Sequence, residues 1–119
     1  MVGKMMNVER IEIGLVSVLR LDGDLDERGV ERLRDVLGTC LAGGCAKLVL
    51  NFRDVRYVSY MGVGVIVERL RRARALRGDI KLVGVNLYTE RLLRMAGVGS
   101  LFDTHDTEAQ AVALFQEVA

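Results

Sequence analysis

The amino-acid sequence predicts an α/β fold, a single domain spanning residues 1–119 in which a mixed, mostly parallel sheet of four to five strands is flanked by four helices. Short apolar runs typical of buried strands alternate along the chain with segments whose apolar residues recur every three or four positions. This alternation is typical of parallel strands joined by right-handed crossovers. The chain has 119 residues, half of them hydrophobic, which suits one domain with one core.

The N-terminal segment is expected to form two strands. Residues 5–11 alternate weakly between polar and apolar side chains, which predicts an edge strand, and a turn around Gly14 follows. Residues 16–21 are an apolar run that predicts a buried strand. Residues 22–26, with the sequence Asp-Gly-Asp-Leu-Asp, are expected to end that strand.

A helix should begin next, because Asp24 and Glu27 have the spacing of a capping box, although Asp26 could also supply the cap. The apolar residues of this helix share one face: Val30, Leu33, Val36, Leu37, Cys40 and Leu41. Gly43 and Gly44 are expected to end it.

The remainder of the chain is expected to supply three more strands and three more helices. The strands are predicted at residues 47–52, 80–85 and 101–103, and residues 53–59 are expected to be a connection. The helices are predicted from Met61 or Gly62 to Arg77, from a Thr89 cap to Ala96, and from Thr107 onward. Thr107 and Gln110 have capping-box spacing, and the apolar residues of the last helix are Val112, Leu114, Phe115 and Val118.

Composition argues against several classes of function. The net charge of +1 and the absence of Trp argue against nucleic-acid binding, which requires a basic face and stacking aromatics. Cys40 and Cys45 are not in a Cys-x-x-Cys pair, and His105 is the single histidine, so no metal or cofactor site is expected. Without a signal peptide or an apolar span, the protein is expected to be cytoplasmic, with both thiols reduced and no membrane insertion.

An enzymatic function is not expected either. No P-loop is present, and Gly62-Val63-Gly64 is too short for a dinucleotide fingerprint. The only histidine lies before the last helix, away from any evident nucleophile. The arginines of the second predicted helix point in several directions, which is typical of a solvated helix surface.

Three segments give the chain its resemblance to a known family. They are residues 21–26, residues 48–66, and residues 85–98 with 101–103. In their apolar and glycine positions they resemble the STAS domain family, the bacterial anti-sigma factor antagonists, from about Val8 to Val112. The resemblance implies a small mixed sheet flanked by helices. It also implies a signalling protein that regulates transcription by binding an anti-sigma factor, itself a GHKL-type serine kinase, and so frees a sigma factor.

The chain departs from the family pattern at the usual regulatory serine. The resemblance places Met61 where the kinase phosphorylates a serine just before a helix glycine, here Gly62. A thioether cannot accept a phosphoryl group. The family's aspartate two positions earlier corresponds to Ser59, and Asn51 replaces an aspartate at the end of the preceding strand. The protein is therefore expected to bind without the usual off-switch, unless Ser59 is a displaced phosphoacceptor instead of a helix cap.

The second predicted helix should present a docking stripe to solvent. On a helical wheel Val63, Ile66, Val67, Leu70 and Ala73 face the sheet, and Met61, Val65, Glu68 and Arg72 lie opposite. The first two residues of this stripe are apolar and the next two are charged, which suits a recognition patch with an apolar centre and a polar rim. If Val65 is exposed, Val65→Asp should weaken partner binding and leave the melting temperature nearly unchanged.

The predicted partner-binding residues surround the start of this helix. They are Asp24, Asp26, Ser59, Tyr60, Met61, Gly62, Val65, Glu68 and Arg72. A scaffold or accessory-subunit role in a larger signalling or transporter complex is the alternative function. The edge strand and the helix stripe could also support a homodimer.

Overall fold

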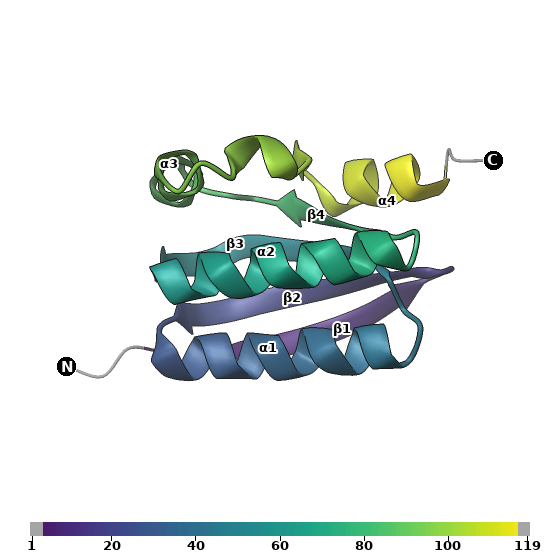
Figure 1. The fold of residues 1–119 in the computed structure, drawn as a ribbon, viewed down its shortest axis with the longest axis horizontal. Coiled ribbons are helices and arrows are strands. Elements are labelled where there is room, and N and C mark those ends of the chain that lie inside the picture. The colour runs from purple at the N-terminus through teal and green to yellow at the C-terminus, as the bar shows by residue number, and fades with distance from the viewer. Residues whose placement is uncertain (1–3, 117–119) are drawn as a thin grey trace.

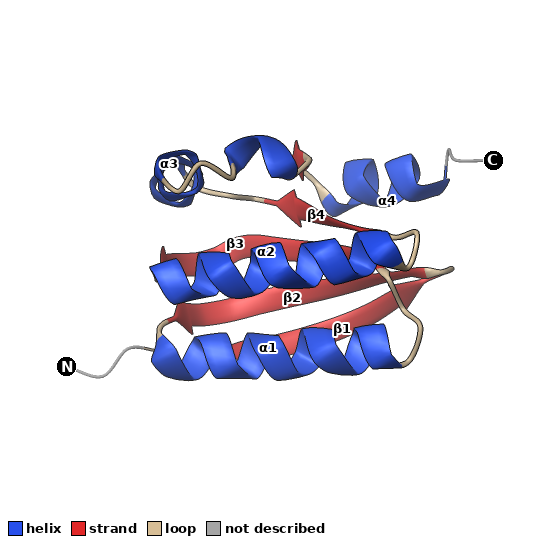
Figure 2. Cartoon of the chain, viewed as in Figure 1, coloured by secondary structure: helices blue, strands red, loops and turns tan. Residues whose placement is uncertain are grey.

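A five-stranded mixed sheet organises residues 4–116, the part of the chain that the computed structural model describes (Figures 1 and 2). The strands are β1 (Asn7–Ile13), β2 (Val16–Leu25), β3 (Lys47–Val58), β4 (Asp79–Val83) and β5 (Thr104–His105). They lie in the order β1-β2-β3-β4-β5. The first pair is antiparallel and the other three are parallel, which confirms the predicted fold class.

Four α-helices cover this sheet: α1 (Glu27–Ala42), α2 (Tyr60–Ala75), α3 (Leu87–Met95) and α4 (Glu108–Gln116). Helices α1 and α2 lie side by side on one face (Figure 1). Helix α4 packs on the opposite face, against valines of β2, β3 and β4. A short 3₁₀ turn (Gly99–Leu101) follows α3. No helix within residues 4–116 is long and apolar enough to cross a membrane.

The helix faces follow the predicted periodicity. In α1 the apolar face is buried as expected, with Val36 half-buried at its margin. In α4 Val112 and Phe115 are buried against the sheet, whereas Leu114 is 39% exposed. Val118, the last apolar residue predicted for this helix, lies outside the described residues.

Two strands extend well beyond their predicted ends. The expected break at residues 22–26 and the expected connection at residues 53–59 are both wrong, because β2 continues to Leu25 and β3 to Val58. The register between them shifts near Gly23, which has a φ of +135°. A Cβ on Gly23 would lie 2.7 Å from the Met5 carbonyl oxygen, so glycine is required there. Burial alternates through residues 20–25 of β2, whereas β3 has pairs of exposed residues between buried ones, and the pairing continues to Val58.

Smaller differences affect the other elements. Strands β1 and β4 are offset from the predicted bounds by one or two residues, and the predicted strand at 101–103 is wrong because β5 begins at Thr104. Asn86, not Thr89, caps α3, and its Oδ1 accepts the Thr89 N–H at 2.8 Å. The cap of α4 is confirmed, since Thr107 Oγ1 accepts the Gln110 N–H at 3.2 Å.

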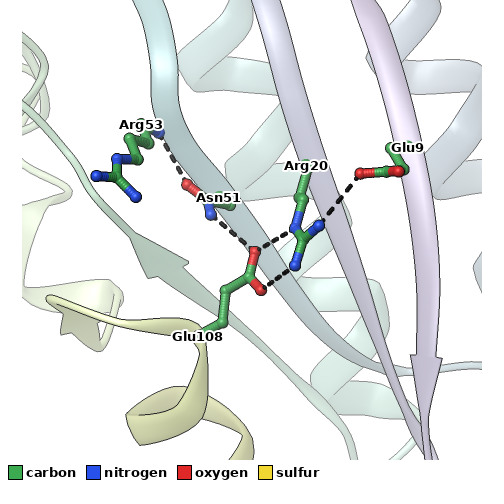
Figure 3. Close-up of polar contacts among 5 residues, drawn as sticks. All are labelled: Glu9, Arg20, Asn51, Arg53 and Glu108. Atoms are coloured by element: carbon green, nitrogen blue, oxygen red, sulfur yellow. Dashed lines mark hydrogen bonds and ion pairs between the residues drawn. The ribbon is translucent and has the colours of Figure 1, made fainter.

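A polar network holds the start of α4 to the sheet (Figure 3). Arg20 donates through Nε and Nη2 to the two carboxylate oxygens of Glu108, both at 2.9 Å. Asn51 Nδ2 donates to Glu108 at 2.8 Å, and Asn51 Oδ1 accepts the Arg53 N–H at 2.9 Å. The hydrogen bond from Arg20 keeps the pKa of Glu108 below its usual value. Asn51 is therefore a hydrogen-bonding residue within β3.

Candidate partner-binding surface

Helices α1 and α2 begin next to each other at the carboxyl ends of β2 and β3. Leu25 and Val58 are partners in the parallel register, and each is followed immediately by the capping residue of a helix. The Ser59 N–H donates to the Leu25 carbonyl oxygen at 3.0 Å, which joins the two strand ends. The two positively polarised N-termini therefore point to the same edge of the molecule.

The two caps differ in charge. Asp26 Oδ1 accepts the Gly29 N–H at 2.9 Å at the start of α1. Ser59 Oγ accepts the Gly62 N–H at 3.2 Å at the start of α2, which confirms the predicted role of Ser59 as a helix cap. The predicted cap Asp24 is wrong: it lies half-buried in the extended part of β2, where its N–H donates to the Lys4 carbonyl oxygen at 3.2 Å.

Large apolar side chains are exposed along this edge. We name this set the carboxyl-edge patch, and its members are Tyr57, Tyr60, Met61, Leu87 and Tyr88. They come from the end of β3, the start of α2 and the start of α3, which lie at the same end of the molecule (Figure 1). Leu87 is 69% exposed, Tyr60 60% and Met61 53%. The Tyr57 and Tyr88 rings stack with centroids 6.4 Å apart, which fixes part of the patch.

A shallow groove between α1 and α2 continues this patch. It encloses about 340 Å³ and is lined by Arg34, Met61, Gly64, Val65, Glu68 and Arg69. Gly64 is exposed, and an added Cβ would have no heavy atom within 4 Å. The missing side chain at Gly64 therefore keeps the groove open. Arg69 spans the two helices, donating to Glu68 at 2.6 Å and to the Arg34 carbonyl oxygen at 3.4 Å.

Two predicted surface residues are buried instead. Val65 is only 9% exposed, because α1 packs beside α2 and covers the side of the helix on which Val65 lies. A helical wheel that considers the sheet alone does not anticipate this neighbour. Gly62 is also buried, and a Cβ there would lie 3.3 Å from Val58 Cγ1 and 3.5 Å from Val30 Cγ2. Glu68 and Arg72 are exposed, as predicted.

The sequence prediction missed three members of the patch: Tyr57, Leu87 and Tyr88. The sequence pattern predicts a connection at Tyr57, and it places Leu87 and Tyr88 between a strand and a helix. The available signal was topological, because side chains that follow neighbouring parallel strands meet at one edge of the sheet.

Potential metal ligands are not grouped in the described part of this region. Among residues 4–116, no three His, Cys, Asp or Glu side chains are grouped to hold a metal ion. A larger cavity of about 640 Å³ lies near α3 and β5, lined in part by Arg94, Ser100 and His105, and none of the predicted site residues lines it. The carboxyl edge therefore offers apolar contact area and hydrogen-bonding side chains, which suits docking.

Comparison with known proteins assigns the chain to a protein family. The sequence model of the STAS domain family matches residues 7–111, which is most of the chain. An anti-sigma F factor antagonist of Paenibacillus polymyxa is 26% identical over 105 residues, covering 87% of this chain and 90% of the relative. An anti-sigma-B factor antagonist of Staphylococcus aureus (strain NCTC 8325 / PS 47) is 23% identical over 101 residues, covering 85% of this chain and 94% of the relative.

Solved structures share the fold. The anti-sigma factor antagonist SpoIIAA in its unphosphorylated form superposes with a TM-score of 0.82 at 23% identity, covering 95% of this chain and 99% of that chain. An anti-sigma factor antagonist from Mycobacterium paratuberculosis gives a TM-score of 0.84 at 18% identity, covering 94% of this chain and 95% of that chain. The fold of this chain, a five-stranded sheet with four helices, is thus shared with solved structures of anti-sigma factor antagonists.

Proposed function

Because the chain belongs to the STAS domain family, we propose that it is a binding regulator whose carboxyl-edge patch docks onto an anti-sigma factor and so frees a sigma factor. The observation that carries this proposal is the exposure of the Met61 side chain, which is 53% exposed. Met61 is the second residue of α2 and belongs to both the patch and the lining of the groove. The relatives of this chain that are named anti-sigma factor antagonists support an anti-sigma factor as the partner.

The chemistry of the patch suits protein docking. Tyrosines provide large, rigid contact areas with a polar tip, and they are enriched among residues that dominate binding energy. Met61 adds an adaptable apolar side chain at the mouth of the groove. A polar rim would surround the apolar centre of the patch, from which a docked partner excludes water. Its members would be Asp24, Asp26, Glu68 and Arg72.

We further propose that the usual kinase cannot switch this protein off. Phosphorylation adds about −1.5 to −2 charges, which must be desolvated when the modified surface is packed against a partner. Met61 has no hydroxyl to accept a phosphoryl group. Ser59 does have one, but its oxygen accepts the Gly62 N–H and holds the first turn of α2. We assign Ser59 to capping and expect no phosphate on it.

Affinity capture from the native cell, with mass spectrometry of the partners and of Ser59, tests both statements. A GHKL-type kinase recovered with the protein, together with unmodified Ser59, is the expected result. Recovery of transporter or scaffold subunits without any anti-sigma factor would instead favour the accessory-subunit role. Phosphate on Ser59 would overturn its assignment as a cap alone.

A restored hydroxyl provides a sharper test of the missing switch. With the captured kinase and ATP, the wild-type chain should incorporate no phosphate, whereas Met61→Ser should be phosphorylated at position 61 and released from the kinase. Met61→Ala is the matched control, since it shortens the side chain without adding an acceptor. Equal phosphorylation of the wild-type chain and Met61→Ser would show that another residue is the acceptor.

A further inference from the structure

The two cysteines lie together at the C-terminal end of α1. The Cys45 N–H donates to the Cys40 carbonyl oxygen at 2.9 Å, and the Gly44 N–H donates to the Leu41 carbonyl oxygen at 3.0 Å. Gly44 has a φ of +82°. These features define a Schellman motif, in which a contact between the side chains at the positions of Cys40 and Cys45 is frequent.

This backbone geometry also suits a disulfide. With ordinary covalent lengths on both sides of a 2.9 Å hydrogen bond, the Cα atoms of Cys40 and Cys45 can be at most about 7 Å apart. Disulfides usually join Cα atoms separated by about 4.4–6.8 Å. The separation of the two Cα atoms is therefore compatible with a disulfide.

Cys45 is the more accessible thiol of the two. It is half-buried and lines a surface cavity of about 350 Å³ together with Arg10, Glu12, Lys47 and Arg77. Three cationic side chains thus face one carboxylate in this cavity. Cys40 is only 1% exposed, and burial raises the pKa of its thiol.

A buried hydroxyl orients the Cys45 sulfur. Ser17, which is fully buried, donates to Glu12 Oε2 at 2.7 Å, and its Oγ lies 2.8 Å from Cys45 Sγ. Because the single hydroxyl proton is directed to Glu12, the Cys45 thiol must be the donor to Ser17 Oγ. Arg10 Nη2 also donates to Ser17 Oγ, at 3.4 Å, so the guanidinium, which is paired with Glu12, shares this hydroxyl with the sulfur.

We propose that Cys45 and Cys40 are an oxidisable dithiol, with Cys45 as the thiol that reacts first with a hydroperoxide and Cys40 as the thiol that resolves it into an intramolecular disulfide. In the first step the Cys45 thiol loses its proton to solvent, and the thiolate attacks one peroxide oxygen. An S–O bond forms, the O–O bond breaks, and hydroxide or alkoxide leaves as water or alcohol after protonation.

In the second step Cys40 attacks the sulfur of the Cys45 sulfenic acid. The S–S bond forms, the S–O bond breaks, and the hydroxide released takes the Cys40 proton to leave as water. Two thiols have then lost two electrons in total to one peroxide. The inference does not depend on the proposed partner, because the pair lies at the end of α1 opposite its start at the carboxyl edge (Figure 1).

Peptide mapping of the full chain after treatment with hydrogen peroxide tests the proposal. No Lys or Arg lies between the two cysteines, so trypsin releases both in the single peptide Asp35–Lys47. After denaturation and alkylation, this peptide should be unalkylated and lighter by two hydrogen atoms, and prior reduction should restore two alkylation sites. Two alkylated cysteines after peroxide, or a bridge only between different chains, would overturn the proposal.

Single variants test the order of the two steps. In Cys40→Ala, the Cys45 sulfenic acid has no resolving thiol and should be trapped by dimedone. In Cys45→Ala, the buried Cys40 should remain an alkylatable thiol after the same treatment. Dimedone labelling of Cys40 with none on Cys45 would overturn the assigned order. The wild-type peptide map remains informative if either variant folds poorly.

Discussion

Gly64→Gln separates binding from stability, because Gly64 faces the open groove in the middle of α2. An added Cβ meets no heavy atom within 4 Å, so the new side chain fits without displacing the core. Glycine in a helix interior costs about 0.8–1 kcal/mol relative to alanine, and glutamine is nearly as favourable as alanine. The free energy of unfolding should therefore rise by about 0.5–1 kcal/mol, which corresponds to roughly 3 °C in melting temperature.

The same side chain should obstruct docking. It would extend from the floor of a groove of about 340 Å³, between Met61 and Glu68. We expect at least a tenfold loss of affinity for the captured partner, equivalent to about 1.4 kcal/mol. Gly64→Ala is the control, since it should gain the same stability and retain most of the affinity.

Thermal unfolding followed by circular dichroism and a titration with the partner measure the two effects. Wild-type affinity in Gly64→Gln would show that the groove is not part of the interface. A lower melting temperature in both variants would show that Gly64 is not free to accept a side chain.

Three further predictions follow from other contacts. Ser59→Ala removes the cap of α2 and should lower the free energy of unfolding by about 1 kcal/mol in urea titrations; an unchanged midpoint would contradict the capping role. Val65→Asp places a carboxylate at a site that is 9% exposed, so it should lower the free energy of unfolding by about 3 kcal/mol and lower the melting temperature. A melting temperature equal to that of the wild-type chain would show that Val65 lies on the surface. Glu108 has a lowered pKa in the folded state, chiefly through Arg20, so its contribution to stability is present above the unfolded pKa of about 4.3 and is lost as pH falls through the folded value. Glu108→Gln should therefore be less stable near neutral pH and lose less stability on acidification; parallel pH profiles in chemical denaturation would count against the pairing with Arg20.

The parts of the fold predicted correctly depend on local rules. The apolar run at residues 16–21 and the face of α1 follow from simple periodicity. The caps at Ser59 and Thr107 follow from side chains that bond a backbone N–H three residues later. Each of these features is determined within a few residues of the chain.

The features that were missed depend on contacts between distant segments. Strand β2 passes through Asp22 and Asp24 because the backbone at Met5 packs against Gly23, and β3 lengthens beside it. Val65 is buried by α1, a helix that is distant from it in the sequence. The stacking of Tyr57 on Tyr88 likewise requires the carboxyl ends of two strands to be neighbours.

The attachment of Lys4 beside Asp24 has a practical consequence for the placement of labels. The Lys4 carbonyl oxygen accepts the Asp24 N–H, so Lys4 is held beside β2, close to the Asp26 cap of α1. At the other end of the described chain, Gln116 Nε2 lies about 3.9 Å from where a Cβ on Gly14 would be, beside the turn between β1 and β2. A fluorophore attached at position 4 would therefore compete with a partner for space at the carboxyl edge, whereas one attached at position 116 would lie beside the turn between β1 and β2.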